Sequence, residues 1–390
     1  MITITDKQLC CGCGACVQKC PKRCISLQAD NEGFAYPVVD AKKCIDCGLC
    51  EKVCPELHPY SPQEPLKVFA AFATDDDIRF RSSSGGIFSL IAENVIAEGG
   101  VVFGARFDRE WQVVIDWTET KDGLEAFRGA KYVQARTGES FRKAEEFLRS
   151  GRKVLYSGTH CQIAGLQHYL GKNYSNLLTV DCLCHGVPSP KVWGMYLDEV
   201  TDAQRRAISD IRFRDKTNGW RMYNFRLDYA GKTEMACHRD NPFMQAFLKN
   251  LILRPSCHKC RAKQGRSHSD ISLADFWGIQ VLHPDMYDDR GASLVTVNTG
   301  KGAQSLDFQH IKCVETSFPD ALPYNSGFES VQPEHRHRSR FFSRLDKCGS
   351  VTALILKEVK PSLKERIVLL PYKTKLAFYR LFPKARSIRR

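Results

Sequence analysis

Six of the eighteen cysteines of this 390-residue chain lie in the stretch 10–24, CCGCGACVQKCPKRC. Four of them follow the pattern C-x2-C-x2-C-x3-C, and a proline comes next. The pattern and its proline return 34 positions later, with the first cysteine moving from 10 to 44 and the last from 20 to 54. Thiolates at this spacing hold [4Fe–4S] clusters, which store and transfer single electrons. The repeat therefore predicts an internal duplication that binds two clusters.

In such a duplication the fourth cysteine of each run binds the cluster of the other run. We expect the first cluster site to consist of Cys10, Cys13, Cys16 and Cys54, and the second cluster site of Cys20, Cys44, Cys47 and Cys50. A zinc site needs two C-x2-C pairs. It would explain neither the third cysteine of each run nor the exchange of the fourth cysteine between the runs. Cys11 and Cys24 fall outside the pattern, and we expect them to be ordinary buried thiols. The stretch 1–57 thus resembles a bacterial two-cluster ferredoxin module.

Composition indicates a globular protein of two or three domains, with 43% hydrophobic and 26% charged residues. The sequence shows no signal peptide and no run of about 18 apolar residues, so we expect a cytoplasmic protein. Thiols stay reduced there, which favours metal ligands over disulfides. The net charge of +13 is concentrated in the stretch 357–390, where eleven Lys or Arg residues accompany two Glu residues. We therefore expect no nucleic-acid partner for the rest of the chain.

Three units of strand, turn and helix follow a proline-rich linker at 58–66. Strands at 101–103 and 154–156, and a helix beginning at Ser189 and Pro190, are the clearest of the predicted elements. The stretches IRFRDKTNGW and YNFRLDYAGKTEM alternate like antiparallel strands. These patterns predict an α/β (α+β) body behind an N-terminal ferredoxin-like domain, with its chemistry at the ends of the strands.

Further cysteines follow the strands of this body. The third cysteine group comprises Cys161, Cys184, Cys257 and Cys260. Four ligands from three segments suit a cluster or a zinc ion, but the spacing leaves unrelated thiols as an equal alternative. Cys182 competes with Cys184, because both face the same side of a strand.

A loop rich in serine and glycine precedes the helix that is predicted from Ile87. It contains Ser83, Ser84, Gly85 and Gly86, with Ser84 as the expected N-cap. Such a loop presents N–H groups and the positive end of the helix dipole to a phosphate, although a capped helix without a ligand is the plain alternative. No GxGxxG motif occurs, so a dinucleotide-binding fold is unsupported.

The ordered set SSSGGIF, GAKYVQA, SGTHCQIAGL, CHGVPSP, FRDKTNGW and SDISLADFWGI resembles the beta-subunit family of coenzyme F420 hydrogenases and dehydrogenases over residues 1–345. The resemblance implies FAD or FMN, and makes the third cysteine group the ligands of a third [4Fe–4S] cluster. It also implies a flavin-phosphate site at the serine and glycine loop. Further implied cofactor-lining residues are Lys131, Tyr132, Gln134, Thr159 and Gln162.

Three residues are candidates for catalysis. Lys131 could stabilise a reduced flavin or a phosphate, or could be a solvated lysine. His160 stands where family members usually have proline, so it could donate a hydrogen bond to a cluster sulfur, protonate a substrate, or simply be packed. His185, next to Cys184, carries the same alternatives. We expect the stretch 334–342, EHRHRSRFF, to be a solvated basic face.

The domain boundaries that we predict are a two-cluster domain at 1–57, the linker at 58–66, the two parts of the beta-subunit-like body at 67–150 and 151–345, and a basic amphipathic tail at 346–390. Apolar and basic residues of the tail favour peripheral contact with anionic lipid at the inner face of the membrane, or equally a solvated or partner-docking segment.

The sequence therefore predicts an iron–sulfur flavoprotein oxidoreductase. A redox partner, a ferredoxin or another electron-transfer subunit, is expected to exchange electrons with the clusters, and a flavin is expected to pass electron pairs to a small-molecule substrate. The alternative is an electron-transfer subunit that serves a partner enzyme and has no substrate of its own.

Overall fold

The N-terminal domain is built from two copies of the same short unit. The computed structural model describes residues 1–360. Each copy begins with a cysteine loop and a glycine in the left-handed region, Gly14 or Gly48, from which a short helix starts. Only glycine adopts this conformation at little cost, so the loop can turn tightly around its cysteines. The elements are α1 (Ala15–Lys19), α2 (Leu49–Lys52) and the antiparallel strands β1 (Ile25–Ala29) and β2 (Ala35–Val39).

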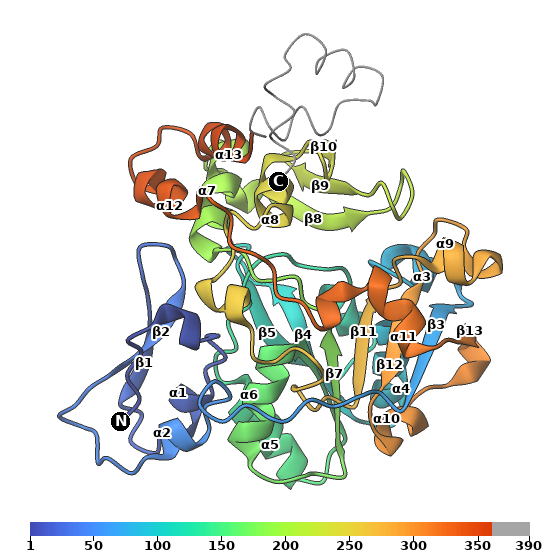
Figure 1. Ribbon diagram of the computed structural model, residues 1–390, viewed down its shortest axis with the longest axis horizontal. Coiled ribbons are helices and arrows are strands. Elements are labelled where there is room, and N and C mark those ends of the chain that lie inside the picture. The colour runs from blue at the N-terminus through green and yellow to red at the C-terminus, as the bar shows by residue number, and fades with distance from the viewer. Residues whose placement is uncertain (361–390) are drawn as a thin grey trace, which may run out of the picture.

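The centre of the body is a mixed eight-stranded sheet with the order β13-β3-β12-β11-β7-β6-β4-β5 (Figure 1). Neighbours β4, β6, β7 and β11 are parallel, whereas β5, β12 and β13 are antiparallel to their neighbours. Parallel strands place their carboxyl ends along one edge, where ligands of such sheets bind. The strands are β3 (Lys67–Ala73), β4 (Val101–Phe107), β5 (Val113–Thr118), β6 (Val154–Thr159), β7 (Leu177–Cys182), β11 (Ile271–Asp275), β12 (Ser293–Val297) and β13 (Ile311–Glu315).

Helices cover both faces of this sheet. On one face, α4 (Ile87–Ala97) buries its apolar residues against β3, β4 and β6. On the other face, α5 (Ser140–Arg149) and α6 (His160–Leu170) pack on β4, β6 and β7, and α1 of the N-terminal domain packs against them. Cys11 and Cys13 belong to this same core, so the N-terminal domain is joined to the body through its cysteine loop. The short helices are α3 (Asp76–Arg81), α9 (Ile279–Leu282), α10 (Gly300–Gln304) and α11 (Phe318–Ala321).

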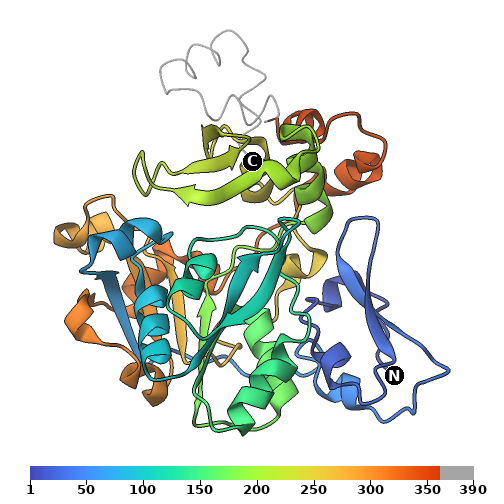
Figure 2. The same ribbon diagram turned by 180° about the vertical axis from the view of Figure 1, so that it is seen from behind.

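A second layer lies over the carboxyl edge of the sheet (Figures 1 and 2). Its three strands are antiparallel in the order β10-β9-β8, and aromatic residues around Trp193 form its core. The last described helix contributes Leu354 and Ile355 to that core. The elements are α7 (Pro190–Val200), β8 (Ile208–Asp215), β9 (Asn224–Tyr229), β10 (Lys232–Cys237), α8 (Pro242–Leu248), α12 (Arg338–Leu345) and α13 (Val351–Val359).

The predicted fold class is confirmed, and so are the antiparallel strands and the helix capped by Ser189. Three details differ. Gly86, and not Ser84, is the N-cap of α4, because the hydroxyl of Ser84 donates to the carbonyl of Ala292 instead. The stretch 334–342 is not wholly solvated, since Arg338 and Phe341 are buried. Helix α13 is packed in the core, so 346–360 is part of the body.

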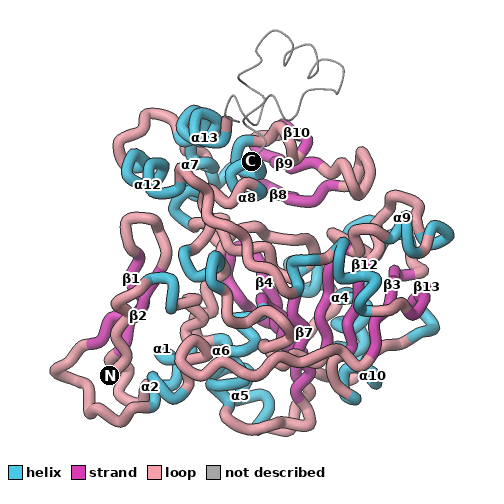
Figure 3. The backbone as a smooth tube through the Cα atoms, in the orientation of Figure 1, coloured by secondary structure: helices cyan, strands magenta, loops and turns pink. Residues whose placement is uncertain are grey.

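The linker at 58–66 is attached along its course. Figure 3 shows it as a loop that crosses from the N-terminal domain towards β3. The backbone N–H groups of Gln63 and Leu66 donate to the carbonyls of Gln264 and Val297. Within residues 1–360, none of the helices has the length and hydropathy needed to cross a membrane. The basic part of the predicted tail, at 361–390, lies outside the described residues.

Candidate cluster and cofactor sites

The four cysteines of the first cluster site come together between α1, α2 and the body. Cys10, Cys13 and Cys16 are buried and Cys54 is half-buried. Burial, with Cys10 and Cys54 close by, raises the pKa of Cys16 to about 12. Four thiolates cannot share so small a buried space without a cation among them. The arrangement therefore suits an iron–sulfur cluster.

The second cluster site is nearer the surface. Cys20, Cys44, Cys47 and Cys50 all line one small cavity. Cys47 is exposed, in contrast to the buried cysteines of the first site. Cys24 lines the same cavity, with its sulfur 3.4 Å from that of Cys20. This cysteine is a fifth thiol at the site, which the pattern of spacings did not single out.

Cys11 occupies a place that the sequence did not reveal. Its buried thiol interacts with Cys13 of the first cluster site on one side and with Cys161 of the third cysteine group on the other. The carboxyl group of Glu56 also bonds to it. On the helix that carries Cys161, Gly165 lies directly against Cys13, and a Cβ added there would lie 2.9 Å from the Cys13 sulfur. Cys11 therefore lies between the two cysteine groups.

The third cysteine group gathers at the carboxyl edge of the sheet. Cys161 is the second residue of α6, Cys184 follows β7, and Cys257 and Cys260 come from the turn after Leu253. Burial raises the pKa of Cys257 to about 12 and of Cys260 to about 11, and in both the neighbouring Cys161 adds to the effect. The Val187 N–H donates to the Cys257 sulfur over 3.3 Å.

Cys184 interacts with both Cys161 and Cys257, whereas Cys182 interacts with Cys161 and its neighbour Asp181. Cys184 thus faces more of the group than Cys182 does. Among residues 1–360, no three His, Cys, Asp or Glu side chains are close enough together to hold a single metal ion. The four cysteine sulfurs that bind a [4Fe–4S] cube lie farther apart than the ligands of a single metal ion. This result therefore concerns single ions and not clusters.

His160 is buried and fixed by a partner at the sheet edge. Its Nδ1 lies 2.7 Å from Oδ2 of Asp181, and the same oxygen accepts a hydrogen bond from Ser267. Burial favours the neutral form of Asp181, but His160 and the nearby serines hold its pKa below the usual value. Nε2 of His160 has no hydrogen-bond partner among the described residues.

His185 is positioned differently. Its Nε2 lies 2.7 Å from Oδ1 of Asn250, and its ring packs edge-on against Phe247 at 4.9 Å. Burial lowers the pKa of His185, although the bond to Asn250 opposes this. A neutral imidazole has a single N–H, and since Nε2 faces an amide oxygen, this N–H is donated to Asn250.

The serine and glycine loop is tied to the rest of the body. The hydroxyl of Ser83 accepts from the Ala130 N–H at 2.6 Å, and the Gly85 N–H donates to the Ser293 hydroxyl at 3.0 Å. A Cβ on Gly85 would lie 2.4 Å from the carbonyl of Ala71, so only glycine fits. The Ser84 hydroxyl already donates its proton to the carbonyl of Ala292, whereas the Ser83 hydroxyl only accepts and can still donate to a phosphate.

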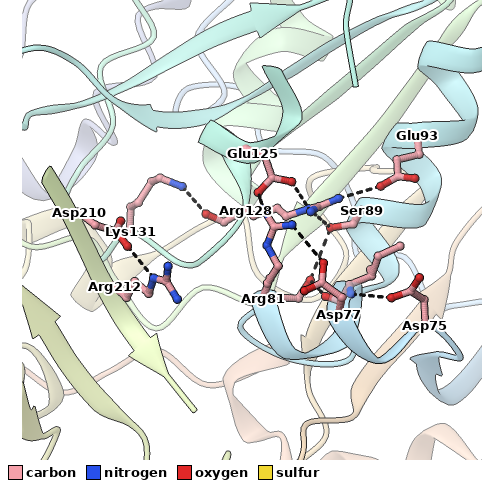
Figure 4. Close-up of polar contacts among 12 residues, drawn as sticks. Asp75, Asp77, Arg81, Ser89, Glu93, Glu125, Arg128, Lys131, Asp210 and Arg212 are labelled. Carbon is pink, nitrogen blue, oxygen red and sulfur yellow. Dashed lines mark hydrogen bonds and ion pairs between the residues drawn. The ribbon is translucent and has the colours of Figure 1, made fainter. Parts of the chain in front are cut away.

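Lys131 comes from the segment that follows Gly129 and lies beside Asp210 of β8 (Figure 4). Its ammonium group donates to the carbonyls of Arg128 and Gly129 at 2.9 and 3.0 Å, while the Arg128 side chain is held by Glu93, Glu125 and Ser89. Desolvation lowers the pKa of Lys131 to about 7, and Asp210 on β8 only partly opposes it. A lysine whose positive charge is so poorly solvated favours an anionic ligand.

The other four residues implied by the resemblance have mainly structural partners. Tyr132 stacks on Phe247 with ring centroids 4.6 Å apart. Thr159 and Gln162 form the capping box of α6, and the Gln162 amide donates to the carbonyl of Ala135. Gln134 donates to the carbonyl of Cys11 at 3.2 Å, so it contacts the N-terminal domain.

Two basic side chains at this edge were not singled out as site residues. Arg214 bonds to Asp275 at 2.6 Å and lies near the Tyr132 hydroxyl. Lys216 donates to the carbonyls of Arg79 and Ser84, and desolvation together with Arg214 and Arg79 lowers its pKa to about 7. Arg214 and Lys216 both lie in the sequence motif FRDKTNGW, but the periodicity of this motif predicts only a strand. Together with Lys131 they give the edge a cationic character that suits a phosphate-bearing cofactor.

A basic cleft adjoins the two cluster sites. Its lining includes Lys19, Lys52 and Lys172, the apolar residues Leu49 and Val53, and no carboxylate. Leu49 and Val53 belong to the segment that carries Cys50 and Cys54. The cleft therefore offers positive charge within a short distance of the clusters.

Comparisons with known proteins show which family the chain resembles. The family models for the coenzyme F420 hydrogenase/dehydrogenase beta subunit match at residues 68–140 (N-terminal part) and 151–320 (C-terminal part), and the model for a 4Fe-4S dicluster domain matches at 9–56. A solved structure of the F420-reducing [NiFe] hydrogenase complex from Methanosarcina barkeri is similar, with 17% identity and a TM-score of 0.45. The match covers 76% of this chain and 90% of that chain. No match was found among functionally curated proteins.

Proposed function

Because the chain belongs to the beta-subunit family of coenzyme F420 hydrogenases and dehydrogenases, we propose that it is an iron–sulfur flavoprotein oxidoreductase. The family consists of oxidoreductase subunits, and the N-terminal domain is a 4Fe-4S dicluster domain. Electrons pass from the two clusters of that domain to a third cluster, then to FAD or FMN, and finally to an organic acceptor. A flavin can take up electrons one at a time and pass them on in pairs, as such a reduction requires.

The three clusters use the twelve cysteines of the cluster sites and the third cysteine group. Cys10, Cys13, Cys16 and Cys54 bind the inner cluster of the N-terminal domain, and Cys20, Cys44, Cys47 and Cys50 bind the outer one. Cys161, Cys184, Cys257 and Cys260 bind the third. Support for this last set comes from its meeting at one sheet edge although its members are distant in sequence.

The observation that carries the proposal is the position of Cys11. The buried Cys11 packs in one hydrophobic cluster with Cys13, a proposed ligand of the first cluster, and with Cys161, a proposed ligand of the third. Electron tunnelling weakens steeply with distance, so a sulfur between two clusters shortens the gap across which the electron must pass. A purely structural protein without a redox role would not need a thiol between the first cluster site and the third cysteine group.

Electrons enter at the exposed side of the N-terminal domain. The second cluster site has an exposed ligand, Cys47, and the basic cleft lies beside the segment that carries Cys50 and Cys54. A redox partner with an acidic surface fits this charge, because complementary charges steer the encounter of two proteins. A ferredoxin or an acidic electron-transfer subunit has that character.

The flavin lies at the carboxyl edge of the sheet, near Lys131, Tyr132 and the loop at 83–86. Lys131 provides positive charge for a phosphate or for a reduced flavin, and the half-buried surroundings keep water from screening it. His160, through its unpartnered Nε2, is placed to hold or deliver a proton near Cys161. The organic acceptor is a deazaflavin or another small molecule, such as a sugar intermediate of the cell surface.

The alternative is an electron-transfer subunit without its own substrate. Oxygen-free purification, followed by quantitation of iron, labile sulfide and flavin, tests the proposal. Three cubes require about twelve iron and twelve sulfide atoms per chain. About eight irons would overturn the third cluster, and the absence of released flavin would overturn the flavoprotein. Deazaflavin reduction by the isolated chain, with dithionite as donor, would favour the enzyme over the subunit.

The C-terminal residues 361–390 are also proposed to contact anionic lipid. Since α13 is part of the core, the chain should be shortened after Lys360 and not within the helix. The intact chain is expected to sediment with vesicles that contain anionic lipid, and the shortened chain is not. Equal sedimentation of the two would overturn the proposal.

A further inference from the structure

An arginine of the body reaches into the N-terminal domain at the first cluster site. Arg254 follows Leu253 just before the turn that carries Cys257, and its side chain has no exposed surface. Its Nε donates to the carbonyl of Cys10 at 2.8 Å, and Nη2 donates to the carbonyl of Ala35 at 3.0 Å. Nη1 donates to Oε1 of Gln134 at 3.0 Å. These bonds fix the plane of the guanidinium.

In this position the guanidinium also meets a thiol. Nη2 lies 3.6 Å from the sulfur of Cys10, and the ring of Tyr36 covers the group with its centroid 4.3 Å from Cζ. Gly12 makes the approach possible, since a Cβ there would lie 2.9 Å from Nη1 of Arg254. Through Gly12 and the carbonyl of Cys10, the cysteine loop is shaped to receive this arginine.

The positive charge of Arg254 has no carboxylate in direct ion pair, although the buried Glu56 interacts with it over a longer distance. Within residues 1–360, no Asp or Glu oxygen lies within ion-pair distance of it, although every other fully or nearly buried arginine of this region, such as Arg338 with Glu32, has one. A buried charge without a counter-charge is costly. An oxidised cube with four thiolates carries a net negative charge, so a cluster bound here would supply the counter-charge.

The two halves of the duplication differ at this point. Cys44 is the counterpart of Cys10, since it stands first in the second run. Its sulfur accepts a hydrogen bond from the backbone N–H of Asp46 at 3.4 Å, and among the described residues no arginine donates to it. Among the described residues, the first cysteine of the pattern therefore receives a bond from an arginine at one site and from a backbone N–H alone at the other.

We propose that Arg254 raises the reduction potential of the inner cluster, and so makes electron transfer from the outer to the inner cluster favourable. The inference rests on the proposed cluster ligands. A cation that bonds to a ligand sulfur stabilises the more negative, reduced state of the cluster. Since Arg254 belongs to the body, the potential depends on the docking of the N-terminal domain.

The test is a redox titration of the full chain, followed by electron paramagnetic resonance without oxygen. Arg254→Met is expected to weaken the electron affinity of the inner cluster at least tenfold, which is about 59 mV for one electron. Arg254→Lys keeps the positive charge but loses the planar guanidinium with its several N–H donors. The shift in the midpoint potential of the inner cluster should therefore be smaller than in Arg254→Met. The signal of the inner cluster is identified by its loss in Cys16→Ser.

Arg338→Met is the matched control. Arg338 also joins the body to the N-terminal domain, through a two-pronged bond to Glu32, but it touches no thiol. Its loss should leave all midpoints unchanged. Equal shifts in Arg254→Met and Arg338→Met, or no shift in either Arg254 variant, would overturn the inference. Wild-type protein without cluster signals would instead overturn the proposed function, so the two failures are distinct.

Discussion

The close approach of α6 to the cysteine loop can be tested by adding one methyl group. Gly165 lies in the middle of α6, and a Cβ there would be 2.8 Å from Cβ and 2.9 Å from Sγ of Cys13. Cys13 cannot move away, because it is a proposed cluster ligand and its carbonyl accepts from Thr137 at 2.9 Å. Overpacking of this kind costs about 1–3 kcal/mol. Alanine in place of glycine within a helix returns at most about 1 kcal/mol.

Gly194→Ala provides the comparison, because Gly194 also lies in the middle of a helix. Its added Cβ would meet a side-chain nitrogen, Nη2 of Arg205, at 3.1 Å, and this neighbour needs to give way only slightly. The higher helix propensity of alanine should then dominate, and the free energy of unfolding should rise by up to about 1 kcal/mol. We therefore expect Gly165→Ala to be about 1–3 kcal/mol less stable than Gly194→Ala.

The assay is the apparent unfolding temperature of the two variants, measured without oxygen at one scan rate, since loss of clusters makes unfolding irreversible. Each kcal/mol corresponds to about 2–4 °C for domains of this size. Proteolysis of the linker at 58–66 should also be faster in Gly165→Ala than in Gly194→Ala. If Gly165→Ala is as stable as Gly194→Ala, the N-terminal domain is not held by this contact, and the reasoning about Cys11 and Cys13 fails with it.

Three further outcomes follow from the carboxyl edge of the sheet. Cys184→Ala should lose about four irons per chain and Cys182→Ala should lose none, as measured by iron quantitation; the reverse result would exchange the two cysteines as ligands. Binding of FMN should weaken as the pH rises above about 7, because Lys131 has a pKa of about 7 and loses its charge there. In Lys131→Gln the dependence of FMN affinity on pH, measured by flavin fluorescence, should be reduced. Arg214→Met should cost about 3–5 kcal/mol, seen as a lower unfolding temperature, because it leaves Asp275 without its cation; Arg214→Met combined with Asp275→Leu should recover part of the loss.

The sequence allowed the elements around its strongest local signals to be predicted. Ser189 and Pro190 begin a helix as expected, because an N-cap and a proline act within one turn. The N-cap at Ser84 was wrong, because the Ser84 hydroxyl bonds to Ala292, more than two hundred residues away. The basic face at 334–342 was wrong for Arg338, whose partner Glu32 lies in the other domain. In both cases the partner is distant in sequence and leaves no local pattern.

By itself the sequence determined the two cysteine runs and their glycines, because a cluster-binding loop is set by spacing over a few residues. It also determined the strands at 101–103 and 154–156 and the helix that begins at Ser189, since periodicity and capping are local properties. Only the tertiary structure decided that Cys11 lies between Cys13 and Cys161, and that Arg254 of the body, and no equivalent residue at Cys44, contacts a cluster thiol. Such contacts depend on how the N-terminal domain docks on α5 and α6, which packing across the whole chain determines.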